Sequence, residues 1–139
     1  MMNSHHKTIP AFGYEIIRDY ALPTILGKHE DDVLYWVGKD IARKFPCSDL
    51  QLIVSFFNDT GWGSLTIEKE LKDGYILQLT NEDLDLLNIK NRKFRLEAGF
   101  IAEQIQVFKG YLTECYDEKK EKANVVQFTV KWDVKEKMS

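Results

Sequence analysis

The stretch from Phe94 to Leu112 constrains the fold of this chain most, because it carries the longest uninterrupted helical period in the sequence. Its apolar residues recur in steps of three and four, which places them on one stripe of an α-helix that faces a core. A second apolar row runs alongside, and only Glu97 and Gln104 lie in the polar strip between the rows. The rows are Phe94, Ala98, Ile101, Ile105, Phe108 and Leu112, and Leu96, Phe100, Val107 and Tyr111. We expect this helix to be the central one.

The remaining face of this predicted helix carries two glycines. Gly99 and Gly110 have no side chain there, so another backbone can come close to the helix at both positions. Glu97, in contrast, is framed by apolar residues on both sides.

Three shorter helices are predicted ahead of the central one. Apolar residues repeat at helical spacing over residues 14–22, namely at Tyr14, Ile17, Tyr20, Ala21 and Leu22. This run should end at Pro23, which lacks a backbone donor, and at Gly27.

The second and third helices have end signals of their own. Residues 33–45 form the second, with Asp31 and Asp32 available as caps. The third opens on the capping-box spacing of Ser48 and Gln51 and ends at Gly61.

The period becomes alternating on both sides of the central helix, which is typical of strands. Residues 65–71 and 75–79 flank an Asp-Gly pair and predict a hairpin. Residues 112–116 and 126–132 predict a second hairpin around the charged link 117–124, whereas 81–93 give no clear assignment. The order is helix-helix-helix-strand-strand-helix-strand-strand, an α+β fold with a four-stranded antiparallel sheet packed against helices.

Composition sets the broad class of the protein. A chain of 139 residues, 44% hydrophobic, fits one domain over residues 1–139, with residues 1–12 expected to be flexible. A net charge of -3 lacks the basic footprint of a nucleic-acid binder, so we expect no nucleic-acid partner. No apolar run approaches the ~18 residues of a membrane span, and no export signal begins the chain, so we expect a cytoplasmic protein.

Five blocks of the sequence carry a family likeness: YEIIRDYALPTILG, VLYWVGKDIARKFP, GWGSLT, LEAGFIAEQIQ and VVQFTVKWD. Together they resemble the YslB-like family, a bacterial family without an assigned function. That family is similar to the TRAPP transport-particle subunits, the 4-vinyl-reductase domain and the haem-based nitric-oxide sensors. The resemblance implies helices on a four-stranded antiparallel sheet with a central helix between two hairpins, and it implies fold rather than chemistry.

The chemistry of these relatives is not carried over to this chain. The resemblance implies a cysteine cluster in the last hairpin of the vinyl-reductase type, but only Cys115 stands there. Haem sensing implies a histidine on a helix, and neither His5, His6 nor His29 lies in a strongly helical stretch. Since ligand spacings for metals are also missing, we predict no metal, no cofactor and no catalytic constellation. Cys115 and Cys47 are expected to be buried, unpaired thiols.

Trp36 falls on the polar side of the second predicted helix, with Lys39 and Arg43 one or two turns away. It is either packed against a sibling helix or an anchor of an interface, where a cation could stack on its ring. The related transport-particle subunits tend to associate through helical faces. Together with the interpretation of Trp36 as an interface anchor, this resemblance predicts a homodimer. Trp62, between two glycines, should plug one end of the core.

Two functional hypotheses follow. The first is a non-catalytic binding module that works through a dimer face or an apolar small-molecule pocket. The second is a small enzyme that acts on an apolar ligand with Glu97 as a buried acid or base. A buried Glu97 must be paired, hydrogen-bonded or neutralised. The predicted partners are Arg43 or Lys131, or the indole of Trp36 or Trp62, while Gln104 is too far for a direct pair.

Overall fold

The computed structural model describes residues 10–81 and 92–137, and it has the predicted α+β architecture. The expected flexibility of residues 1–12 falls mainly on residues 1–9, which lie outside the described residues. The elements are α1 (Ala11–Glu15), η1 (Ile16–Ala21), α2 (Leu22–Leu26), η2 (Gly27–His29), α3 (Glu30–Lys44), α4 (Leu50–Thr60), β1 (Ser64–Leu71), β2 (Gly74–Thr80), α5 (Arg95–Lys109), β3 (Tyr111–Lys120), η3 (Glu121–Ala123) and β4 (Val125–Lys137).

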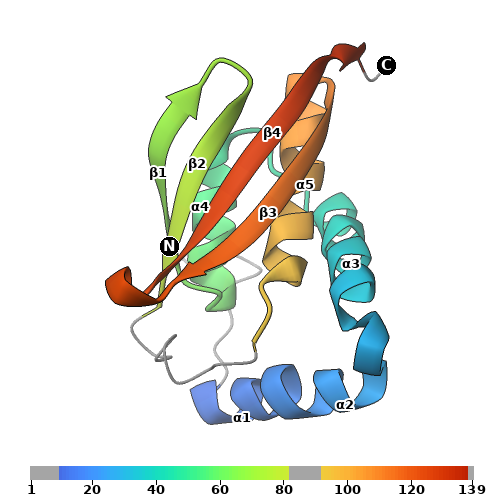
Figure 1. Cartoon of the computed structure of the whole chain (residues 1–139), viewed down its shortest axis with the longest axis vertical. Coiled ribbons are helices and arrows are strands. Elements are labelled where there is room, and N and C mark those ends of the chain that lie inside the picture. Colours follow the sequence, from blue (N-terminus) through green and yellow to red (C-terminus); the bar gives the residue numbers. More distant parts are fainter. Residues whose placement is uncertain (1–9, 82–91, 138–139) are drawn as a thin grey trace.

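The four strands form one antiparallel sheet in the order β1-β2-β4-β3, so β1 and β3 are its edges. Figure 1 shows α4 and α5 behind this sheet, α3 beside α5, and the segment from α1 to α2 lying across one end of the molecule. Alternate sheet residues such as Leu77 and Phe128, which are register partners, point into the core under the helices. No helix among the described residues covers the front face of the sheet.

The helix α5 is central, as predicted, since its residues from Leu96 to Ile105 are all buried. Gly99 lies against the backbone of α3, where an added Cβ would collide with the carbonyl of Tyr35. Gly38 of α3 meets the carbonyl of Leu96 in the same way, so two glycines permit the close packing of α3 on α5.

The predicted end of this helix is wrong by three residues. Gly110 adopts a left-handed conformation with φ 82° and ends α5 at Lys109, so it is a stop rather than a contact. Tyr111 and Leu112 therefore belong to β3, and Val107 of the expected apolar row is exposed.

The starts of α3 and α4 also differ from the prediction. The α3 helix begins at Glu30, so Asp31 and Asp32 lie in its first turn rather than at the cap position. Their negative charges interact favourably with the positive end of the helix dipole. Asp49 rather than Ser48 caps α4, and its side chain accepts a hydrogen bond of 2.9 Å from the Leu52 amide. Gly61 ends α4 in the left-handed region, as expected.

The N-terminal helical segment continues through Pro23 to Leu26 instead of ending there. The turn ahead of the proline widens into the π-helix η1, and the Leu22 amide donates to the carbonyl of Ile17, five residues back. Because Pro23 cannot donate, an ordinary α-helical bond at that position is not available. Gly27, with φ 54°, then ends α2 as predicted.

Trp62 is buried at one end of the core, as the sequence predicts. Its ring packs edge-on against Phe57 at 5.1 Å and Phe100 at 5.4 Å between ring centroids. Cys47 and Cys115 are buried and unpaired, again as predicted.

Candidate functional site

The segment α1-η1-α2 has an unusual arrangement of polar and apolar residues. Tyr14, Arg18 and Leu22 recur every four residues and form its inner row, and Arg18 is only 3% exposed. Phe12, Ile16 and Tyr20 are offset by two residues, which places them on the opposite side of the helix, where they are exposed. The charged half of this segment therefore faces the protein and the apolar half faces outward.

Arg18 forms a buried, bidentate ion pair with Glu97 in the first turn of α5. Its Nη2 lies 2.6 Å from Oε1 and its Nη1 lies 2.9 Å from Oε2 of the glutamate, whose exposure is 1%. The same guanidinium donates to the Tyr14 hydroxyl at 2.7 Å and to the Lys93 carbonyl at 3.0 Å. Burial lowers the pKa of Arg18, but the charge and hydrogen bonds of Glu97 reverse this effect and leave the pKa raised. Both charged groups are thus fully paired.

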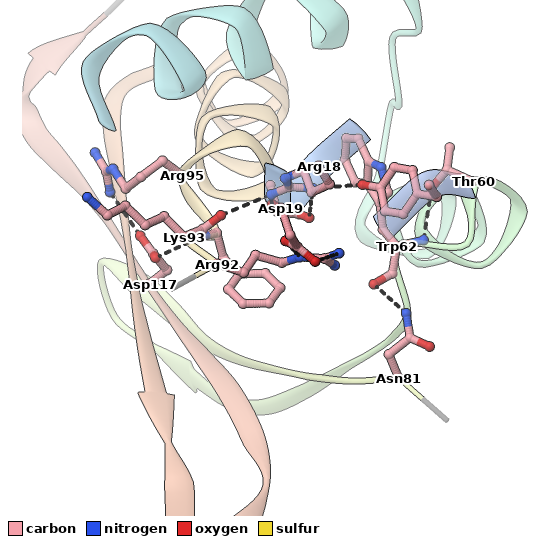
Figure 2. A network of polar contacts seen from close by, with 12 residues as sticks. Arg18, Asp19, Thr60, Trp62, Asn81, Arg92, Lys93, Arg95 and Asp117 are labelled. Carbon is pink, nitrogen blue, oxygen red and sulfur yellow. Dashed lines mark hydrogen bonds and ion pairs between the residues drawn. The ribbon is translucent and has the colours of Figure 1, made fainter. Parts of the chain in front are cut away.

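A second bidentate pair lies beside the first. Asp19 accepts from Arg92 through both carboxylate oxygens, at 2.6 and 2.8 Å, and Arg92 is buried while it lies 5.5 Å from the centre of the Tyr14 ring. Figure 2 shows Arg18 and Asp19 pointing from the η1 turn toward Arg92 and Lys93. Neighbouring residues of the π-helix therefore fasten the N-terminal segment to the chain that leads into α5.

Asp117 of β3 completes the network at the start of α5. It accepts from the Phe94 amide at 3.2 Å and from Arg95 at 3.1 Å. The Lys93 ammonium lies 2.9 Å from Asp31 of α3, whose hydrogen bond raises the pKa of this lysine. A hollow of about 630 Å³ adjoins these groups, but its lining is dominated by charged side chains rather than by the apolar wall expected for an apolar ligand.

The prediction that Glu97 is buried and must be paired, hydrogen-bonded or neutralised agrees with the structure, but the predicted partners are wrong. Arg43 pairs with Glu103 at 3.3 Å, Lys131 lies 3.8 Å from Asp73, and Arg18 pairs with Glu97. The sequence contained one usable signal, the spacing of four between Tyr14 and Arg18. It was missed because a charged residue was not expected on the inner side of a helix.

Gln104 has a different role from Glu97, although both lie on the same strip of α5. Its Oε1 accepts from the Cys47 amide at 2.9 Å, and its Nε2 donates to the carbonyls of Phe45 and Ala42 at 2.8 and 3.3 Å. These bonds hold the end of α3 and the following link against α5. Gln104 is therefore a satisfied polar group of the core.

The outer side of the N-terminal segment consists of two neighbouring rows. One row is Phe12, Ile16 and Tyr20, and the other holds Ile17 and Ile25. Exposure ranges from 44% at Ile16 to 75% at Ile25. We call these five residues the outer apolar face. The helical spacing of Ile17 and Tyr20 does not place them in the core, because the buried ion pairs turn the polar side of the helix inward.

The predicted interface residues of α3 do not form one cluster. Trp36 is 65% exposed, which agrees with the interface interpretation rather than with core packing. Lys39 lies 5.0 Å from the ring centre of Tyr35, and Arg43 pairs with Glu103 at 3.3 Å. The two cations that could have stacked on Trp36 therefore contact other groups.

Burial governs the chemistry of the two thiols. It raises the pKa of Cys47 to about 11, with a smaller contribution from Asp49, and it raises the pKa of Cys115 well above its usual value, with a contribution from Asp117. Within residues 10–81 and 92–137, no three His, Cys, Asp or Glu side chains gather into a metal site. His5 and His6 lie outside those residues.

Three comparisons place this architecture among known proteins. The fold is that of the vinyl-4-reductase type. A vinyl-4-reductase family protein from Methanocaldococcus jannaschii has a TM-score of 0.67 at 16% identity, covering 91% of this chain and 83% of that protein. A mutant Fe(II) unliganded H-NOX protein from K. algicida has a TM-score of 0.57 at 14% identity, covering 91% of this chain and 75% of that chain. At these identities the likeness shows the fold alone.

The family is identified by sequence. This chain belongs to the family described as protein of unknown function (DUF2507), which matches residues 11–131. It is similar to "Uncharacterized protein YslB" of Bacillus subtilis (strain 168), with 41% identity over 128 residues that cover 91% of this chain and 86% of that protein. The predicted membership of the YslB-like family is confirmed. No helix within the described residues combines the length and apolar character that a membrane crossing requires.

Proposed function

We propose that this chain is a non-catalytic interaction module that forms a homodimer through the outer apolar face of α1-η1-α2. The observation that carries the proposal is the inverted helical segment, whose charged side is buried in ion pairs while Phe12, Ile16, Ile17, Tyr20 and Ile25 are exposed. Monomeric proteins rarely expose a contiguous apolar patch of this kind without using it.

The size of the face supports a second copy of the chain as its occupant. A buried aromatic or large aliphatic side chain contributes on the order of 150–250 Å², so these five residues expose on the order of 550 Å² at their observed fractions. This area is a large part of the ~800 Å² that each partner buries in a stable interface. No charged residue lies in the two outer rows, so a symmetric helix-to-helix contact would strand no charge.

Gly13 supports close approach of a second helix. It lies in the same outer row as Ile17, and an added Cβ there would meet nothing within 4 Å. Glycine in a helix costs about 1 kcal/mol relative to alanine, and no contact among the described residues requires a glycine at this position. A membrane surface fits less well, because surface helices carry Lys and Arg on the half opposite the apolar one. Here that half contains Arg18 and Asp19 in buried ion pairs.

The enzyme hypothesis has less support. It needs Glu97 to exchange a proton with a ligand, but both oxygens of Glu97 accept from Arg18 and the side chain is enclosed. A carboxylate held in this way serves the packing of α5 better than proton transfer.

Light scattering coupled to size exclusion tests the dimer. We expect about twice the chain mass of 16.2 kDa at tens of micromolar protein. The variant Ile17→Glu/Ile25→Glu should shift the protein to the monomer, because it places two charges in the interface. Val107→Glu/Val134→Glu is the matched control, since both valines are more than half exposed and lie outside the face.

The interface is located by comparing variants. Trp36→Ala should weaken the dimer by about 2 kcal/mol if the face extends onto α3. A monomeric parent protein at 50 µM, or a dimer that survives the Ile17/Ile25 change, contradicts the proposal. Loss of the dimer in the Val107/Val134 control would move the interface to another surface.

A further inference from the structure

An open hollow of about 850 Å³ lies on the face of the sheet opposite the helices. Its floor is apolar and comes from Ile76 of β2, Val125 of β4 and Ala123 of the turn before β4. Two glutamines, Gln78 and Gln127, lie within it and are register partners across β2 and β4. The hollow is separate from the outer apolar face, which belongs to the N-terminal helices.

A β-bulge brings the first lysine to this hollow. In β1 the regular pairing shifts between Ile67 and Lys69, so that Lys69 becomes the partner of Ile76. Register partners in antiparallel strands point to the same face, and Ile76 points to the open one. If Glu68 were paired regularly and no bulge were present, strict alternation would have placed Lys69 on the core face with Ile67. The bulge thus turns a cation from the edge strand toward the hollow.

Three more lysines come from the end of β3 and the η3 turn. Lys120 and Lys122 line the same hollow, and Lys120 is the register partner of the floor residue Val125. Lys119 also borders the hollow, but its register partner is the core residue Val126, and it lines the charged hollow beside Arg92 as well. Asn124, with φ 55°, closes the turn that leads from Lys122 into β4.

The local charge is opposite to that of the whole chain. Among the described residues, four lysines and one glutamate line the hollow, whereas the chain carries a net charge of -3. Lys120 lies 3.2 Å from Glu118, in a pair exposed enough to be weak. Lys69 and Lys122 take part in none of the ion pairs among the described residues. Lys69 and Lys122 therefore offer positive charge to the hollow that no ion pair among the described residues takes up.

We propose that this hollow binds a small organic phosphate, with the phosphate among the lysines and the apolar or aromatic body on Ile76 and Val125. Lysine ammonium groups bind phosphate as point charges, and several of them suit a group with more than one negative charge. The two glutamines add amide donors and acceptors for polar atoms of the body. The volume falls within the ~300–1,000 Å³ range of small-molecule sites.

The test is an NMR titration of the ¹⁵N-labelled full chain at 150 mM salt with 1-naphthyl phosphate as the probe. We expect saturable shifts of the amides of Ile76, Gln78 and Gln127 at sub-millimolar to millimolar probe. Inorganic phosphate, which lacks the body, and 1-naphthyl β-glucoside, which lacks the charge, should each bind at least tenfold more weakly. If inorganic phosphate binds as tightly as 1-naphthyl phosphate, the proposed role of the apolar floor is wrong. If 1-naphthyl β-glucoside binds as tightly as 1-naphthyl phosphate, the proposed recognition of phosphate by the lysines is wrong.

Charge-reversal variants assign the binding to the hollow. Lys69→Glu/Lys122→Glu should weaken the binding of 1-naphthyl phosphate by roughly tenfold or more, because two attractive charges become repulsive at short range. Lys28→Glu/Lys137→Glu changes the net charge equally outside the hollow and should leave the affinity within about twofold, since distant charges are screened. Similar losses in both variants, or no shifts around the hollow in the parent, overturn the proposal and leave the lysines as protection of exposed sheet edges.

Discussion

Replacing Glu97 by leucine should destabilise the fold strongly, because it leaves the buried charge of Arg18 without its counter-ion. Arg18 would keep the Tyr14 hydroxyl and the Lys93 carbonyl as acceptors, but it would lose both bonds to the carboxylate. Removing one partner of a buried pair costs about 3–5 kcal/mol. With a urea dependence of about 2 kcal/mol per molar, the unfolding midpoint should fall by roughly 2 M.

Two further variants separate the causes of that loss. Glu97→Gln keeps one acceptor for Arg18, so it should cost less than Glu97→Leu. Arg18→Met/Glu97→Leu removes both charges and should recover most of the stability, because apolar residues often replace a buried ion pair at little cost.

Urea unfolding, followed by tryptophan fluorescence and far-ultraviolet circular dichroism at pH 7, measures all three variants. A double variant as unstable as Glu97→Leu would show that the stranded cation is not the cause. If Glu97→Leu and Glu97→Gln both unfold like the parent while ligand retention or an activity is lost, the structural role is refuted and Glu97 belongs to a site.

Three other predictions follow from the packing and the buried groups. Gly99→Ala should destabilise the protein by about 2 kcal/mol or more, because its Cβ would collide with the Tyr35 carbonyl and separate α3 from α5. Urea unfolding measures the loss, and a variant as stable as the parent would contradict this packing. Burial raises the pKa of Tyr35 to about 12, so between pH 10 and 12 the folded state keeps the phenolic proton that the unfolded state releases. The free energy of unfolding should therefore fall as the pH rises through that window, and it should fall less steeply in Tyr35→Phe. Equal slopes in the parent and the variant would contradict this. Cys47 and Cys115 should resist iodoacetamide at pH 8 and react in 6 M urea, as mass spectrometry would detect; rapid labelling of the native protein would refute the burial of the thiols.

The order of helices and strands, the central position of α5 and the burial of Glu97 were all determined by local sequence patterns. A stripe with steps of three and four reports a helix that is buried on most sides, and an Asp-Gly pair between alternating runs reports a hairpin. The close approach at Gly99 was also predictable, since a glycine within a strongly helical stretch indicates a contact that a side chain would block. That contact is with the backbone of α3.

The ends of elements were less accessible to local reasoning. Gly110 ends α5 because its φ is positive, whereas Gly99 lies within the helix. The helical period of the sequence is the same at both glycines, so it does not show which of them ends the helix. Asp49 instead of Ser48 caps α4, a difference of one residue that depends on how the chain leaves α3.

Tertiary structure alone decided which side of the N-terminal helix faces inward and what neutralises Glu97. Arg18 and Glu97 are 79 positions apart, so no spacing rule connects them. The usual expectation places apolar residues inside, but two bidentate pairs reverse it, because a buried carboxylate on α5 requires a cation and Arg18 supplies it. The bulge that turns Lys69 to the open face is defined by the pairing of β1 with β2, so it forms only when the two strands lie side by side.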